Sequence, residues 1–149
     1  MNDILEKLNR VRDEILAEKT KGSLRLFVLA ARADLENKWD ILFSADWLEK
    51  TNSEKDLIYI IGKLKSSFSG NLDFLVRIVV ATPSETFIKQ LADAILKRNE
   101  GRQEEIKELS TPTVVFKQIF VLTLDFRGIN LNEIGTEDGP IAVKKISEF

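Results

Sequence analysis

The sequence predicts one α/β or α+β domain built on a mixed sheet of about four strands. Stretches with apolar residues at three-and-four spacing, typical of amphipathic helices, alternate with short continuous apolar runs, typical of strands buried on both faces. A chain of 149 residues also has the size of a single domain, which we place at residues 1–149. The expected order is α-β-β-α-β-α-β, with an N-terminal helix, two crossover helices and a C-terminal tail.

The first expected element is an amphipathic helix at residues 2–19. Asn2 or Asp3 can cap its first turn, and Gly22 ends it. Its apolar stripe consists of Ile4, Leu5, Leu8, Val11, Ile15 and Leu16. A stripe of this width suits packing on the sheet of the same domain or pairing with a second copy.

Two strands are expected next, at residues 23–31 and 39–44. The first contains the continuous apolar run 26–31, and the second reads Trp-Asp-Ile-Leu-Phe-Ser. The connection between them has the length of a hairpin loop, so we expect them to be antiparallel neighbours.

A second helix is expected over residues 53–68. Ser53, with Asp56 three positions later, resembles a capping box with the shorter acid. Apolar residues recur at helical spacing as far as Phe68, and the Ser-Gly-Asn sequence of residues 69–71 ends the helix.

A third strand at residues 73–81 leads into a third helix that starts at residues 82–85 and ends at about Arg98. Pro83 lies in the first turn of that helix or just ahead of it. Strand–helix–strand crossovers are right-handed, which makes the second and third strands parallel. The direction of the fourth strand is left open.

The last part of the chain begins with residues 99–112, a charged and turn-prone connection that we expect to be a mobile loop. A long fourth strand follows at residues 113–126, and Gly128 marks its exit. The tail at residues 128–149 is expected to be irregular, apart from one small strand candidate at 141–143.

The composition excludes several kinds of chemistry. The chain contains no histidine and no cysteine, which removes imidazole proton shuttles, thiolate nucleophiles, disulfides and ordinary zinc sites. A formal net charge of −2 offers no strong field for nucleic acid. Apolar runs are far shorter than a membrane span, and charges from Asp3 onward interrupt any secretory signal. We therefore expect a cytoplasmic protein without nucleic-acid or membrane partners.

Ligands of open sheets bind beyond the carboxyl ends of the parallel strands. This rule predicts a ligand-binding rim where polar side chains follow the second and third strands, and the residues after the fourth strand join it if that strand is parallel to them. Helix N-termini nearby favour an anion, and an arginine can hold a phosphate or carboxylate bidentately. The competing interpretation is that these residues are helix caps, strand ends and a surface ion pair. The candidate residues are Ser44, Asp46, Thr82, Ser84, Asp125 and Arg127.

Cofactor motifs are scarce. The sequence contains neither Gly-x-x-x-x-Gly-Lys nor Gly-x-Gly-x-x-Gly, so no nucleotide-binding loop is predicted. Four acids, Asp34, Glu36, Asp40 and Asp46, surround the hairpin, and Mg²⁺ needs only one or two carboxylates besides substrate oxygens. We predict no cofactor, with Mg²⁺ as the alternative if the rim binds phosphate.

Two hypotheses for function remain. The first is a non-enzymatic protein-interaction module acting as a homodimer, because the fourth strand has apolar residues on both faces and would be a liability at a sheet edge. The second is a protein that binds a small molecule, nucleotide or phosphate at the rim.

Overall fold

The computed structural model describes residues 2–19, 22–33, 38–48, 53–99, 105–133, 135 and 142–145. Three helices and six strands are defined in this part of the chain. Along the sequence they are α1 (Asn2–Glu18), β1 (Leu24–Arg32), β2 (Trp39–Ala45), α2 (Ser53–Ser67), β3 (Leu75–Val80), α3 (Thr86–Asn99), β4 (Glu105–Ser110), β5 (Val115–Leu124) and β6 (Ala142–Lys145).

All six strands form one mixed sheet in the order β4-β5-β1-β2-β3-β6. β1 is antiparallel to both of its neighbours, β2 and β5, so β5 runs in the same direction as β2. β2 and β3 are parallel and are connected through α2. The predicted mixed sheet and the predicted element order are therefore confirmed, and β4 and β6 are additional strands.

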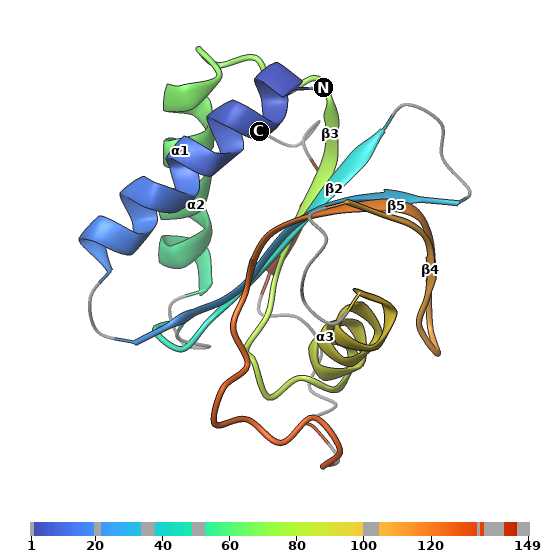
Figure 1. Cartoon of the computed structure of the whole chain (residues 1–149). Coiled ribbons are helices and arrows are strands. Elements are labelled where there is room, and N and C mark those ends of the chain that lie inside the picture. The colour runs from blue at the N-terminus through green and yellow to red at the C-terminus, as the bar shows by residue number, and fades with distance from the viewer. Residues whose placement is uncertain are drawn as a thin grey trace.

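The sheet is covered on both faces, by α1 and α2 on one side and by α3 on the other (Figure 1). Alternate residues of β2 belong to opposite cores: Ile41 and Phe43 pack with α1 and α2, whereas Leu42 packs with α3. This alternation follows from the two-residue period of a strand. A strand covered in this way reads as a continuous apolar run, which is why β1 and β2 were recognisable.

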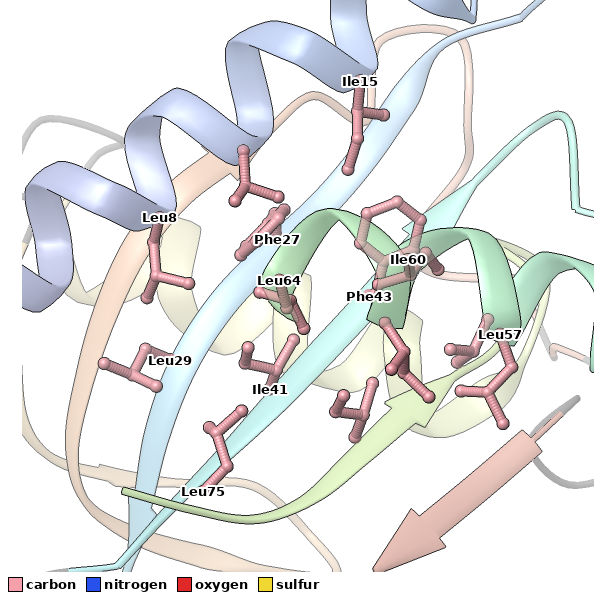
Figure 2. Close-up of a cluster of buried hydrophobic side chains, with 14 of the residues drawn as sticks. Leu8, Ile15, Phe27, Leu29, Ile41, Phe43, Leu57, Ile60, Leu64 and Leu75 are labelled. Atoms are coloured by element: carbon pink, nitrogen blue, oxygen red, sulfur yellow. The ribbon is translucent and has the colours of Figure 1, made fainter. Parts of the chain in front are cut away.

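The core under α1 and α2 is the larger of the two (Figure 2). α1 buries Leu8, Val11 and Ile15 completely, three residues of the predicted stripe. Each such side chain stabilises the fold by about 2 kcal/mol relative to exposure, before its entropy is counted. The edge-to-face pair of Phe27 and Phe43 lies at the centre, with ring centroids 5.6 Å apart.

The segment 99–112, expected to be a mobile loop, contains strand β4, so that prediction was wrong for residues 105–110. β4 pairs antiparallel with β5, and both curve around α3 (Figure 1). The strand buries only Ile106 and Leu109, because it lies at the edge of the sheet. Its remaining residues are charged or polar, as in a loop, and this explains the error.

The tail at residues 128–149 was expected to be irregular except for a strand candidate at 141–143. β6, at Ala142–Lys145, confirms that candidate and pairs antiparallel with β3. The tail therefore supplies the second edge of the sheet.

A long fourth strand left uncovered at a sheet edge would favour a homodimer. In the structure this strand is β5, and it is paired with β4 on one side and β1 on the other. The new edge strand is protected as well, since Arg98 of α3 donates hydrogen bonds to the carbonyls of Lys107 and Glu108 at 3.0 and 2.9 Å. Self-association would need a surface other than β5.

Two glycines differ in how closely neighbouring atoms pack against them. An added Cβ at Gly135 would lie 2.4 Å from the carbonyl oxygen of Ser84, whereas one at Gly62, on an exposed part of α2, would meet nothing within 4 Å. We expect Gly135→Ala to lower the free energy of unfolding by about 2 kcal/mol. Gly62→Ala, the control, should raise it by up to about 1 kcal/mol, because alanine is the better helix former. Urea denaturation of both variants measures this, and equal effects would contradict the close contact at Gly135.

Candidate functional site

The ends of β2 and β5 meet at one end of the sheet, as the strand directions require. Asp46 follows β2 and Asp125 follows β5, and Arg25 of β1 lies between them. The Arg25 guanidinium donates to both carboxylate oxygens of Asp46, from Nε at 3.0 Å and from Nη2 at 2.9 Å. Its Nη1 donates to the carbonyls of Asp125 and Arg127 at 3.1 and 2.9 Å. Arg25 of β1 thus hydrogen-bonds to the residues that follow β2 and β5.

The carboxylates of this cluster are already paired. The hydrogen bond from Arg25 lowers the pKa of Asp46 below its ordinary value, and the backbone N–H of Ser23 acts in the same direction. The hydrogen bond from Arg127 likewise lowers the pKa of Asp125. The two arginines and two aspartates of this cluster balance each other in charge, and their hydrogen bonds stabilise this end of the sheet.

Arg127 was the candidate for holding a phosphate or carboxylate. Its guanidinium instead donates to both oxygens of Asp125, from Nε at 2.9 Å and from Nη2 at 3.0 Å. The side chain is 91% exposed. This is the surface ion pair that the sequence offered as the competing interpretation.

The other three candidates of the rim do not join this cluster. Ser44 is completely buried on the α3 face of β2, and its Oγ has no hydrogen-bond partner among the described residues. Thr82 and Ser84 hydrogen-bond to each other through their hydroxyls at 3.1 Å. Gly135 lies against the backbone of Ser84 and Thr86, at the start of α3. The structure therefore brings together Asp46, Asp125 and Arg127, and no hydrogen bond among the described residues links Ser44, Thr82 or Ser84 to them.

The acids considered for Mg²⁺ are also separated. Asp40 lies at the start of β2 and Asp46 just beyond its end, which is about 20 Å at the usual rise of a strand. Asp34 and Glu36 lie outside the described residues. Within the described ranges, no group of three or more acids has the spacing of a metal site.

A cavity of about 190 Å³ lies elsewhere, between α3, the middle of the sheet and the turn that joins β4 to β5. Its walls are mostly apolar: Leu42 and Val79 from the sheet, Phe87 and Leu91 from α3, and Val114 and Phe116 at the start of β5. Arg77 of β3 and the turn residues Thr111 and Thr113 add polar groups. Thr111 also holds the turn together, because its Oγ1 accepts from the N–H of Val114 and donates to the carbonyl of that residue, both at 3.0 Å.

Arg77 connects the cavity to a second charged cluster. Asp40 is only 2% exposed, and its Oδ2 lies 3.0 Å from Nε of Arg77 and 3.2 Å from Nε of Arg32. Arg77 is the direct neighbour of Asp40 across the parallel strands, and Arg32 extends from the antiparallel strand on the other side. All three side chains project from the α3 face of the sheet, by the alternation of their strands.

The two clusters differ in their balance of charge. Arg25 and Arg127 face two carboxylates, whereas Arg32 and Arg77 share the carboxylate of Asp40. Among the described residues, the second cluster therefore has one more arginine than carboxylate, beside an apolar cavity. Sequence reasoning missed it, although one signal was available. Asp40 and Arg77 each interrupt a run of apolar residues in a buried strand, and a charged residue at such a position needs a partner.

The sequence matches no protein-family model, and comparisons with curated proteins and with solved structures found no significant match. In the described part of the chain, no helix has the length and apolar character needed to cross a membrane. The two charged clusters and the cavity are therefore the basis for a proposal on function.

The Arg25 cluster predicts a specific dependence of stability on pH. Asp46 has a lowered pKa in the folded protein, so its contribution is complete well above the ordinary value of 3.8 and is lost as the pH falls through the lowered value. We expect Arg25→Met to cost about 2 kcal/mol near neutral pH, because the carboxylate loses its charged donor. The variant should also lose less stability than the wild type on acidification.

Urea denaturation at several pH values between about 6 and 3 measures both effects. Arg10→Met is the matched control, because Arg10 pairs with Glu6 on α1 and both side chains are more than 60% exposed. The control should keep the stability and the acid dependence of the wild type. Parallel curves for wild type and Arg25→Met would contradict the role given to Arg25.

The Asp40 cluster predicts a larger loss. Asp40→Asn leaves two guanidinium groups facing each other without a carboxylate, and breaking such a buried pair costs about 3 kcal/mol or more. The control is Asp13→Asn, since Asp13 is 65% exposed and pairs with Arg12 at the surface of α1. Thermal or urea unfolding compares the two, and an equally small effect of both substitutions would show that Asp40 is not needed to compensate its arginines.

Proposed function

We propose that the protein binds a small molecule whose apolar group occupies the cavity between α3 and the sheet. The single observation that carries this proposal is the cavity itself, a mostly apolar hollow between α3, the sheet and the turn that joins β4 to β5, which opens to the surface at that turn. Protein interiors contain few voids larger than a water molecule, and each void costs contacts. A cavity that a ligand fills recovers those contacts.

The size of the cavity limits the ligand. An apolar cavity of about 150 Å³ accommodates benzene, so a cavity of about 190 Å³ suits one six-membered ring or a short branched chain. Typical drug-sized sites are larger, at about 300 Å³ or more. The ligand is therefore a small molecule, or it inserts only one group.

Access to the cavity is supported by the residues at its mouth. Arg77 has a side chain that is 30% exposed, and Thr113 lies on the surface in the turn between β4 and β5. An apolar interior with a few polar groups at the opening is the usual composition of a ligand site. The proposal keeps the second hypothesis drawn from the sequence, ligand binding, but places the ligand under α3 instead of at the rim.

Binding is favoured over catalysis by the residues available. The chain has no histidine or cysteine, and among the described residues the polar side chains that line the cavity are one arginine and two threonines. One of these threonines, Thr111, already bonds to the backbone of the turn. This set can orient a ligand, but it includes no general base.

A filled-cavity variant tests the proposal. Val114→Phe places a ring in the cavity, whereas Val115→Phe adds the same ring at the next position, where the side chain is 53% exposed. We expect toluene and indole to raise the melting temperature of the wild type and of Val115→Phe but not that of Val114→Phe. Ligand-observed NMR with the same probes provides an independent readout. If neither probe binds the wild type, or if Val114→Phe binds as well as the wild type, the proposed site is wrong.

A further inference from the structure

We propose that the natural ligand of the cavity is a monocarboxylate, with its apolar group inside the cavity and its carboxylate on Arg77. This inference rests on the proposed function and deepens it by naming the chemical class of the ligand. Its basis is that Arg77 belongs both to the wall of the cavity and to the cluster of Arg32 and Asp40.

The hydrogen bonds of Arg77 leave one edge of its guanidinium available. Nε donates to Asp40 at 3.0 Å, and neither Nη1 nor Nη2 makes a hydrogen bond to another described residue. A carboxylate binds a guanidinium through two parallel hydrogen bonds, and the two Nη atoms provide one such pair of donors. Asp40 fixes the plane of the guanidinium from the other side, so little side-chain entropy remains to be lost when a ligand binds.

The charges of the residues around Arg77 also favour a ligand with one carboxylate. Counting the described residues, Arg32 and Arg77 share the carboxylate of Asp40, which leaves one positive charge that a single ligand carboxylate can neutralise. Asp40 is 2% exposed, and the side chains of Arg32 and Arg77 are 24% and 30% exposed, so solvent screens this charge only partly. A primary amine would meet a like charge, and an uncharged alcohol would leave the excess charge uncompensated.

The length of the ligand follows from the position of Arg77 on the wall. The apolar group and the carboxylate must be joined by a short link, as in 3-phenylpropionate. A free acid and the C-terminus of a peptide that ends in an aromatic residue share this chemistry. The shared feature that we assign is one ring, a short link and one carboxylate.

Three ligands that differ only in their polar group test the assignment on the unmodified protein. Isothermal titration of 3-phenylpropionate, 3-phenyl-1-propanol and 3-phenylpropylamine should give the lowest Kd for the acid, by about tenfold or more over the alcohol. The amine should bind most weakly. If the alcohol binds as tightly as the acid, the carboxylate assignment is wrong while the cavity remains a binding site. If none of the three binds, the proposed function fails as well.

Variants of Arg77 test whether this residue causes the preference for the acid over the alcohol. Arg77→Met should bring the ratio of the Kd values for acid and alcohol, measured in the same variant, close to one, whereas Arg77→Lys should retain part of the preference because the charge remains. Arg127→Met is the matched control, since Arg127 is 91% exposed and does not line the cavity. An unchanged preference in a folded Arg77→Met would overturn the role of Arg77. The wild-type comparison decides the question if that variant does not fold.

An acetylated tripeptide that ends in phenylalanine distinguishes the two sources of the carboxylate. Tighter binding of the tripeptide than of 3-phenylpropionate would identify a peptide C-terminus as the ligand, and the C-terminal amide of the same peptide should then lose about tenfold or more in affinity. Tighter binding of the free acid would identify a small metabolite. An amide that binds as tightly as the free C-terminus would contradict the carboxylate assignment.

Discussion

Strands β1 and β2 lie at the centre of a sheet that is covered by helices on both faces, so a charged side chain on either strand loses much of its water. Such a charge costs several kcal/mol unless a partner compensates it. The residues of β2 show the two ways in which a buried strand meets this constraint, with apolar side chains or with paired charges. Its apolar residues fill the two cores, and the acids near its ends, Asp40 and Asp46, are each held by arginines from neighbouring strands. The positions of Arg25, Arg32 and Arg77 are therefore tied to the burial of the sheet.

The same burial explains which elements the sequence made visible. β1, β2 and β3 are covered on both faces and form continuous apolar runs, and α1 and α3 present apolar stripes of helical period. β4 has only Ile106 and Leu109 as apolar residues, three positions apart, and this spacing does not alternate as a strand should. Its strand conformation depends on hydrogen bonds to β5, and single-sequence patterns do not report such pairings.

The sequence indicated which residues could lie together at one end of the sheet. It did not indicate which side chains hydrogen-bond to them. The rule that ligands lie beyond the carboxyl ends of parallel strands placed Asp125 beside Asp46 only if the fourth strand runs parallel to the second, and β5 does run in that direction. It could not indicate that Arg25, just before the apolar run of β1, would bond to the Asp46 carboxylate and the Asp125 carbonyl. A register is set by pairing across strands, so the partner of a charged residue depends on long-range contacts that local patterns leave open. The cavity depends in the same way on how β4 and β5 curve around α3.

Counting charges separates the two ends of the sheet. Beyond β2, two arginines meet two aspartates, every carboxylate oxygen has a donor, and the arginine with the most exposed side chain, Arg127, is itself bidentate to Asp125. At the start of β2, two arginines meet one aspartate, and one of these arginines also lines an apolar cavity. Arg77 donates the hydrogen bond to Asp40, whereas Nε of Arg32 lies 3.2 Å from the same oxygen without hydrogen-bonding to it. Arg77 therefore compensates a buried carboxylate through Nε, and under the proposed function its two Nη atoms are the donors that a ligand carboxylate would meet.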